Sequence, residues 1–156
     1  MKTIIDSFDK EYSFLSNFFP CIIKFDGNDY PSVEHAYQAA KTKNKQEQFK
    51  IWQAATPGIA KRLGRKVTLR EDWEEVKVDI IREFVHQKFQ NETLRKLLLA
   101  TEDATLVEGN CWNDYFWGVC NGVGQNWLGK ILMKEREKIA AILKNNIGKM
   151  RAPGLD

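Results

Sequence analysis

Apolar residues recur at intervals of three and four positions over six stretches of the chain, and this periodicity predicts six helices. The longest apolar stripe contains Trp73, Val76, Ile80 and Phe84, and it predicts a helix from about residue 71 to residue 90. Capping residues and a helix-start proline mark the beginnings of shorter helices. These shorter helices are expected over residues 31–41, 46–54, 56–63, 91–100 and 128–143.

An Asp-Gly pair between two apolar segments predicts a β-hairpin. Residues 21–25 and Tyr30 flank Asp26 and Gly27, and such a pair readily adopts the positive φ angles of a tight reversal. Further short strands are expected over residues 3–8 and 104–108.

Residues 14–20 form an apolar segment that is interrupted by Ser16 and Asn17. We expect this segment to lie against the core, with its two polar side chains hydrogen-bonded or facing a ligand. No repeat or low-complexity linker divides the chain. We therefore expect one domain over residues 1–147 and a flexible tail over residues 148–156.

The composition is typical of a soluble globular domain. Of the 156 residues, 43% are hydrophobic and 29% are charged, and a net charge of +3 permits an anionic ligand without requiring one. No run of about 18 apolar residues that could span a membrane occurs.

Three cysteines without a CxxC pair favour a reducing compartment, and we predict the cytoplasm. Two histidines without a metal-binding pattern predict no metal site, and nothing indicates a cofactor or an obligate protein partner.

One side of the first predicted helix carries three chemically different side chains. Helical spacing places Glu34, Gln38 and Lys41 on that side, with Tyr37 beside them. Such a face is either a solvated surface or a place where an acid, an amide and an amine converge. His35 lies about 100° away around the helix, so a structural hydrogen bond is expected for it.

Residues 109–129 contain five of the ten glycines and three of the five tryptophans. Glycine lets the backbone approach a ligand closely, and tryptophan offers a flat face for a heterocycle. The stretch indicates either a stacking pocket walled by a loop or aromatic side chains that fill a core. It is not a dinucleotide fingerprint, because Trp127 stands where Gly122 and Gly124 would require a third glycine.

A basic span begins in the third predicted helix and continues past its end. This span is either a solvated face or a phosphate contact beside a cleft. It consists of Lys61, Arg62, Arg65, Lys66 and, a little further on, Arg70.

Five short motifs stand in order along the chain. They are Ser16-Asn17-Phe18; Ser32-x-Glu34-His35-x-x-Gln38-Ala39-x-Lys41; Asp72-Trp73-Glu74-x-Val76-Lys77; Asn113-Asp114-x-Phe116-Trp117-Gly118; and Gly122-x-Gly124-x-Asn126-x-Leu128-Gly129. In this order and at this spacing they resemble the YbiA-like or NADAR family, over about residues 8 to 143. The resemblance implies a compact, mainly helical α+β fold, which agrees with a single domain of about six helices and a small sheet or hairpin.

The same resemblance implies hydrolysis of an N-glycosidic bond between a ribose and a heterocyclic base. Within the family, substrates include ADP-ribose attached to guanine, free or in DNA, and ribosylamino-pyrimidine phosphates of riboflavin synthesis. We expect removal of ADP-ribose from guanine, with the riboflavin intermediates as the alternative. A third reading, of another class, is a module that binds ADP-ribose or a nucleotide without turning it over.

The matching motifs imply three catalytic residues. Glu34 would stabilise positive charge at the anomeric carbon and orient the attacking water. Asp114 would hold the ribose hydroxyls or share proton transfer with Glu34. Lys41 opens another route, in which an unprotonated amine attacks the anomeric carbon and forms a Schiff base with the opened sugar. Both routes stay open at this point.

The motifs also imply the groups that bind the substrate. Trp73 and Trp117 are expected as ring platforms, although Trp73 also fits the apolar stripe of its helix. Asn17, Gln38 and Asn126 are expected to hydrogen-bond the sugar, the base edge or a phosphate. The motif residues Ser16, Phe18, Phe116 and Gly118 complete the expected contacts.

Two of the tryptophans, Trp112 and Trp127, match none of the motif positions, and core packing is expected for both. The expected partner is a substrate that bears ADP-ribose or ribose phosphate, with modified DNA as one form of it. The resemblance implies no metal and no cofactor.

Overall fold

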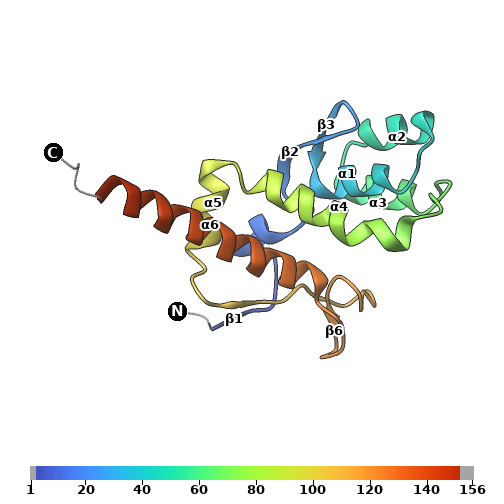
Figure 1. Ribbon diagram of the computed structural model, residues 1–156. Helices are drawn as coiled ribbons and strands as arrows, with labels where there is room; N and C mark the ends of the chain where they lie inside the picture. Colours follow the sequence, from blue (N-terminus) through green and yellow to red (C-terminus); the bar gives the residue numbers. More distant parts are fainter. Residues whose placement is uncertain (1–2, 152–156) are drawn as a thin grey trace.

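The computed structural model describes residues 3–151, which form six α-helices, one 3₁₀-helix and six short strands (Figure 1). The strands are β1 (Ile4–Ile5), β2 (Pro20–Phe25), β3 (Asn28–Ser32), β4 (Thr105–Leu106), β5 (Gly109–Asn110) and β6 (Val119–Cys120). The helices are η1 (Lys10–Leu15), α1 (Val33–Ala40), α2 (Lys45–Trp52), α3 (Pro57–Gly64), α4 (Trp73–Lys88), α5 (Glu92–Leu99) and α6 (Trp127–Arg151). This mainly helical α+β architecture confirms the predicted fold class.

The hairpin of β2 and β3 leads directly into α1, the helix with the candidate chemistry. Asp26 and Gly27 have φ angles of 49° and 83°, so both adopt the left-handed conformation that the predicted tight turn requires. β3 ends at Ser32, whose Oγ accepts the backbone N–H of His35 at 3.0 Å and caps α1. Side-chain caps begin α3 and α5 as well, at the predicted residues.

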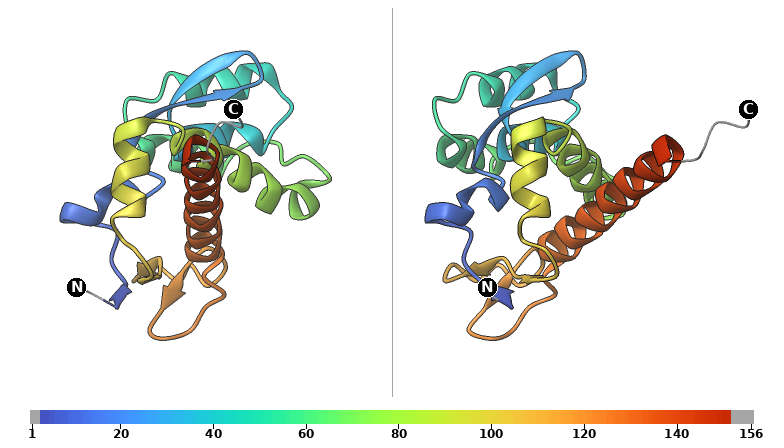
Figure 2. Two further views of the ribbon diagram at one scale, coloured as in Figure 1. Left: turned by 60° about the vertical axis from the view of Figure 1, so that its left-hand side comes forward. Right: turned by 90° about the vertical axis from the view of Figure 1, so that its left-hand side faces the viewer.

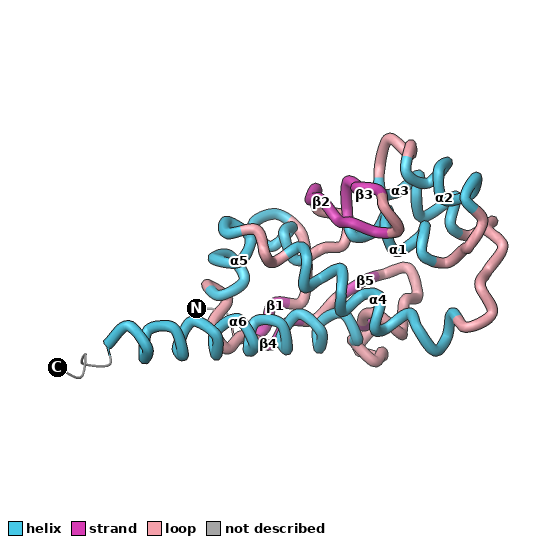
Figure 3. Tube along the Cα trace, turned by 45° about the horizontal axis from the view of Figure 1, so that its top comes forward, coloured by secondary structure: helices cyan, strands magenta, loops and turns pink. Residues whose placement is uncertain are grey.

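Two parallel strand pairs, each only two residues long, join segments that are far apart in the sequence. β1 pairs with β4, with Ile4 opposite Thr105, and β5 pairs with β6. The strands expected over residues 3–8 and 104–108 are therefore present but shorter than predicted. β4 lies against α6 (Figure 3), so the chain that follows β4 is held between the N-terminal strand and the last helix.

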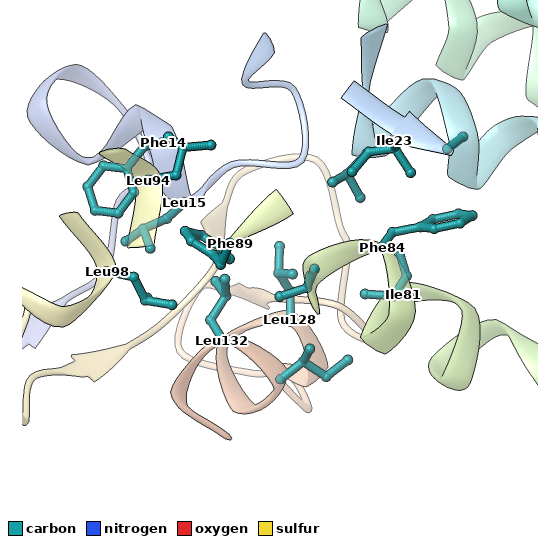
Figure 4. Packing of buried hydrophobic residues seen from close by; sticks show 14 of the residues in the cluster. Phe14, Leu15, Ile23, Ile81, Phe84, Phe89, Leu94, Leu98, Leu128 and Leu132 are labelled. Atoms are coloured by element: carbon teal, nitrogen blue, oxygen red, sulfur yellow. The ribbon is translucent and has the colours of Figure 1, made fainter. Parts of the chain in front are cut away.

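The apolar stripes of α4, α5 and α6 meet η1 and β2 in one core (Figure 4). Phe14 and Leu15, at the end of η1, are buried in it and Phe19 packs against it, as predicted for this segment, whereas Phe18 is exposed. The small residues Ala36, Ala39 and Ala40 of α1 are fully buried, and they let α2, α3 and α4 pack closely around that helix. The other labelled core residues are Ile23, Ile81, Phe84, Phe89, Leu94, Leu98, Leu128 and Leu132.

The last helix, α6, is longer than the sequence indicates. Its last buried residue is Ile139, yet the helix continues to Arg151, and its end projects beyond the other elements (Figures 1 and 2). Residues 148–151 of the predicted tail are therefore helical, because Ala, Leu, Lys and Met favour helix here and no proline follows until Pro153. Residues 152–156 lie outside the described part of the chain. No helix in the described part is both long and apolar enough to cross a membrane.

Candidate active site

Residues from the first helix and from the Gly- and Trp-rich stretch line a single cavity. Its volume is about 620 Å³, and its walls come from the loop after η1, from α1 and α3, and from the chain between β4 and β6. The predicted site residues that line it are Ser16, Asn17, Phe18, Glu34, Gln38, Lys41, Asp114 and Trp117. Segments that are far apart in the sequence therefore meet at one place.

Two of the α1 side chains in this cavity, Glu34 and Gln38, are buried. The two residues are 7% and 3% exposed, and Gln38 Nε2 donates to Glu34 Oε1 at 2.7 Å. The backbone N–H of Glu34 donates to Asn17 O at 2.9 Å, which ties the first turn of α1 to the loop after η1. The interpretation of this helix face as a solvated surface is therefore wrong.

His35 serves the fold, as expected. Its Nε2 bonds Ala54 O at 2.9 Å, and its Nδ1 bonds Ser32 Oγ at 2.7 Å. A carbonyl oxygen only accepts, so Nε2 carries the proton and Nδ1 accepts from the Ser32 hydroxyl. Both ring nitrogens are thus engaged within the fold, away from the cavity lining.

Opposing charges act on the Glu34 carboxyl group. Burial raises the pKa of Glu34, the Gln38 amide and the ammonium groups of Lys61 and Lys41 oppose this rise, and the Asp114 carboxylate adds to it. The protonation of Glu34 therefore depends on which other groups of the cavity are charged. Although several acids share the cavity, the described residues include no group of three or more His, Cys, Asp or Glu placed to hold a metal ion.

Lys41 directly follows α1, and its ammonium nitrogen lies 5.3 Å from the centre of the Tyr37 ring. Burial lowers the pKa of Lys41, Glu34 opposes this shift, and neighbouring cations, among them Lys61 and Arg65, lower the pKa further. A lowered pKa increases the share of neutral amine, which is the form that acts as a nucleophile.

Tyr37 stands between the two tryptophans that were expected as ring platforms. Trp117 lines the cavity, and its Nε1 donates to the Tyr37 hydroxyl at 3.0 Å. Trp73 is 5% exposed and packs behind Tyr37, with the two ring centres 5.2 Å apart. Trp73 therefore does not line the cavity; it packs in the apolar stripe of α4, which was the alternative for this residue.

Asp114 lies on a loop that its own carboxylate helps to hold. Asp114 Oδ1 accepts the backbone N–H groups of Phe116 at 3.2 Å and of Trp117 at 2.9 Å. Asn110 Oδ1 in turn accepts the N–H of Asp114 at 3.0 Å. One carboxylate oxygen is therefore engaged in the turn, which fixes the direction of this side chain at the cavity.

Three further predicted contacts, Phe116, Gly118 and Asn126, do not line the cavity. Phe116 stacks on the ring of Trp127 instead, with centres 6.1 Å apart. Gly118 and Asn126 both contact the backbone of Glu108. Their prediction as substrate contacts is corrected accordingly: these residues shape the wall behind the cavity.

The mouth of the cavity holds groups that the sequence analysis misplaced or left open. Trp112, expected in the core, is 55% exposed and lines the cavity. Lys61 lies between two exposed rings, with its ammonium nitrogen 5.2 Å from the centre of Trp112 and 5.9 Å from that of Phe18. Arg65 also lines the cavity, and neither cation forms an ion pair within residues 3–151.

Only part of the basic span lies at the cavity. Of its five members only Lys61 and Arg65 line the cavity, while Arg70 pairs with Asp72, with Nε 2.6 Å from Oδ1. The spacing of one helical turn between residues 61 and 65 was the available signal. Glu108, which also lines the cavity, has no such signal, because a single glutamate before a glycine is unremarkable in sequence.

Comparisons with known proteins give the family. The NADAR domain model matches residues 5–140. The N-glycosidase YbiA of Shigella flexneri serotype 5b (strain 8401) is 42% identical over 144 residues, which cover 88% of this chain and 89% of that protein. The riboflavin biosynthesis protein VVA0006 of Vibrio vulnificus (strain YJ016) is 42% identical over 135 residues, which cover 84% of this chain and 36% of that longer protein.

Among solved structures, the NMR structure of the Escherichia coli protein YbiA resembles this fold with a TM-score of 0.78. The likeness covers 99% of this chain and 92% of that chain, at 36% sequence identity. Family match, sequence identity and fold therefore agree over nearly the whole length. The chain belongs to the NADAR domain family.

Proposed function

We propose that this N-glycosidase cleaves the bond between the ribose of ADP-ribose and guanine, in a free nucleotide or in DNA. The proposal is carried by one observation: Glu34, Lys41 and Asp114 converge on a cavity that also contains two cations without ion-pair partners in the described chain. Carboxylates and an amine suit the reacting sugar, whereas the cations suit phosphates.

Glu34 is suited to the reacting carbon. Departure of the base leaves positive charge at the anomeric carbon, and a buried carboxylate beside that carbon stabilises the charge. Gln38 Nε2 holds Glu34, whereas Gln38 Oε1 is shielded from solvent beside Gly64 and has no hydrogen-bond partner among the described residues. Asp114, on its loop, supplies a second acceptor for the ribose hydroxyls.

Lys41 supplies a covalent route beside direct hydrolysis. In the covalent route its neutral amine bonds to the anomeric carbon while the bond to the base breaks and the base leaves with the electron pair. The sugar then opens to a Schiff base, which water hydrolyses to free sugar and free amine. In the direct route water attacks the same carbon and Glu34 accepts its proton.

Reduction with borohydride during turnover separates the two routes. A Schiff base on Lys41 would be reduced to a stable amine, and the peptide that contains Lys41 would gain the mass of ADP-ribose less one water plus two hydrogens. We expect this adduct, and expect it to disappear in Lys41→Arg. An enzyme that turns substrate over without any adduct would leave direct hydrolysis as the mechanism.

The mouth of the cavity is suited to the rest of the substrate. Phe18 and Trp112 present flat exposed rings on either side of Lys61, and such rings stack on heterocycles. Lys61 and Arg65 can each contact phosphate oxygens. A volume of about 620 Å³ is also within the usual range for small-ligand sites.

A second substrate class is favoured by one of the relatives. The V. vulnificus relative is named as a riboflavin biosynthesis protein. A ribosylamino-pyrimidine phosphate has the same kind of N-glycosidic bond and would use the same acids, with one phosphate for the cations instead of two. The two classes therefore differ at the mouth of the cavity and not at the reacting carbon.

Purified protein incubated with each substrate distinguishes the classes. The substrates are ADP-ribosylated guanosine monophosphate, the same modified base in an oligonucleotide, and a ribosylamino-pyrimidine phosphate, with products identified by mass spectrometry. We expect unmodified guanine from the first two and a slower release from the third. Release from the pyrimidine alone would select the second class, and binding without release from any of the three would indicate a binding module instead.

The cytoplasm stays the proposed compartment. Cys21, Cys111 and Cys120 are all free thiols. Free thiols, one of them exposed, are typical of a reducing compartment. Fractionation of cells that produce the tagged protein tests this proposal.

A further inference from the structure

Glu108 is the third carboxyl group of the cavity, and its environment differs from those of Glu34 and Asp114. Its Oε2 is shielded from solvent and has no hydrogen-bond partner among residues 3–151. Glu34 accepts a hydrogen bond from Gln38, and Asp114 accepts two from backbone N–H groups. Donors stabilise a carboxylate, so a buried carboxyl group that lacks them is more readily protonated.

The backbone at Glu108 is held from both sides. Its N–H donates to Asn126 Oδ1 at 3.0 Å, and its carbonyl accepts the N–H of Val119 at 2.8 Å. A Cβ atom at Gly118 would lie 2.1 Å from Glu108 O and 2.9 Å from Glu108 Cγ, so only glycine leaves room for this backbone and side chain. Asn126 and Gly118, which do not line the cavity, therefore hold Glu108, which does.

Asn126 is itself held in a strained position. It has a φ of 54°, and its Nδ2 donates to Leu106 O at 3.0 Å, so its amide bridges the chain on both sides of Val107. A Cβ atom at Gly129 would lie within 2.5 Å of both terminal atoms of that amide. Three of the six glycines and asparagines in the last two motifs, namely Gly118, Asn126 and Gly129, thus converge on the position of Glu108.

Charged groups from four parts of the fold act on Glu108. Burial raises its pKa to about 7, and the carboxyl groups of Asp114, on the loop before β6, and Glu34, on α1, raise it as well. Lys61 on α3 and Lys88 on α4 oppose this rise. Near neutral pH, Glu108 therefore exists in both its acid and its carboxylate form.

We propose that Glu108 is the general acid of this site. As the bond between the anomeric carbon and the base nitrogen breaks, the electron pair stays on the nitrogen and the proton of the Glu108 carboxyl passes to it, so that the base leaves neutral. Glu34, whose carboxyl group accepts a hydrogen bond from Gln38, acts as the carboxylate partner at the sugar. This inference rests on the proposed N-glycosidase reaction.

The kinetic test compares the wild-type protein with Glu108→Gln and Glu108→Asp, and with the exposed control Glu75→Gln on α4. We expect Glu108→Gln to lower kcat by roughly 10²- to 10⁴-fold, the usual contribution of an acid–base group. The wild-type rate should fall as the pH rises above about 7, because the acid form is lost, and this alkaline limb should be absent in Glu108→Gln. Glu108→Asp should restore part of the rate together with the limb.

A second measurement does not depend on turnover. A carboxyl group whose pKa is higher in the folded than in the unfolded protein stabilises the fold at low pH, and this contribution is lost as the pH rises through the folded pKa. We therefore expect the difference between the urea midpoints of Glu108→Gln and the wild type to increase in favour of the variant between pH 5 and pH 8. The midpoints also show whether each variant folds.

The two measurements separate failure of this inference from failure of the proposed function. A wild-type protein that releases no base from any substrate contradicts the proposed function, whatever the urea midpoints show. An active wild type whose rate and alkaline limb are unchanged in a folded Glu108→Gln overturns the role of Glu108. If the difference between the urea midpoints of Glu108→Gln and the wild type is the same at pH 5 and pH 8, Glu108 does not hold a proton near neutral pH, and its role as the acid is overturned as well.

Discussion

At the scale of single residues, Glu34 combines deep burial with one fixed partner. We predict that Glu34→Gln keeps substrate affinity within a few-fold, because glutamine is isosteric and still accepts from Gln38 Nε2. Turnover should fall by roughly a hundredfold or more, since an amide cannot exchange the proton or balance the charge at the anomeric carbon. Calorimetric binding and single-turnover rates measure the two effects separately.

The matched control for this variant is Glu75→Gln, because Glu75 is exposed on α4 and lines no part of the cavity. It should retain wild-type affinity and turnover. Full activity in Glu34→Gln, with the protein folded, would remove Glu34 from the mechanism and leave Asp114 and Glu108 as the acids of the site.

The exposed ring of Trp112 leads to a second prediction. Trp112→Ala should raise KM by roughly 5- to 100-fold, since stacking on an aromatic side chain is worth about 1–3 kcal/mol per base. We expect kcat to change little, because the ring lies at the mouth and not at the reacting carbon. Trp112→Phe, which keeps a flat ring, should restore most of the affinity. An unchanged KM in Trp112→Ala would show that no heterocycle of the substrate stacks on this ring.

Residues whose placement follows from local spacing could be predicted. Glu34, Gln38 and Lys41 meet because a helix repeats every 3.6 residues, and that period is visible in the sequence. The exposure of a tryptophan depends on contacts with distant parts of the chain: Trp73 is 5% exposed and packs against Tyr37, whereas Trp112 is 55% exposed. The motif match therefore did not show that Trp73 packs in the apolar stripe of its helix, which was its alternative, or that Trp112 is exposed at the cavity.

At the scale of elements, α1 and α3 cross where Gly64 meets Gln38. A Cβ atom at Gly64 would lie 1.8 Å from Gln38 Oε1 and 2.6 Å from Gln38 Cδ, so Gly64→Ala must displace this amide. Gln38 would then lose its hydrogen bond to Glu34. We predict a loss of roughly tenfold or more in kcat, since small displacements of a catalytic group are costly. Rates and thermal melts of the same samples measure this.

The control for this variant is Gly58→Ala in the same helix, where the nearest atom to a new Cβ would be Thr56 Oγ1 at 3.8 Å. We expect wild-type activity there, together with a small gain in stability. The thermal midpoint of Gly64→Ala should fall somewhat while the protein stays folded, because the new Cβ would also lie 3.0 Å from Gln38 Cβ and the displaced amide leaves a buried carboxyl group without its donor. Normal turnover in Gly64→Ala would mean that Gln38 does not position Glu34.

Elements with their own start signals could be predicted, and elements made by distant pairing could not. The helices that begin at Val33, Pro57 and Glu92 each follow a residue whose side chain caps them. The strand pairs β1–β4 and β5–β6 are two residues long, and neither strand of a pair is stable without the other. Their partners could not be read from one segment, so the position of Glu108 between β4 and β5 was missed.

At the scale of the whole molecule, the packed domain ends before the chain does. The family model matches residues up to 140, and the last buried residue of α6 is Ile139. Beyond that point the helix is held by its own backbone hydrogen bonds and by residue preference, with no core to face. The predicted end at residue 143 followed the apolar stripe, which loses its packing partners before the helix ends.

Because α6 continues past its last buried residue, we can predict the effect of shortening this helix. A chain that ends at Asn145 should keep its turnover and a thermal midpoint within about 2 °C, since exposed residues away from packed features contribute about 0.5 kcal/mol or less. Ile139→Ala, at the last buried position of α6, should by contrast lower the free energy of unfolding by about 2–4 kcal/mol. The removed turns include the exposed apolar residues Ile147 and Met150. A midpoint that falls on truncation and depends on protein concentration would show instead that these residues are buried between copies of the chain.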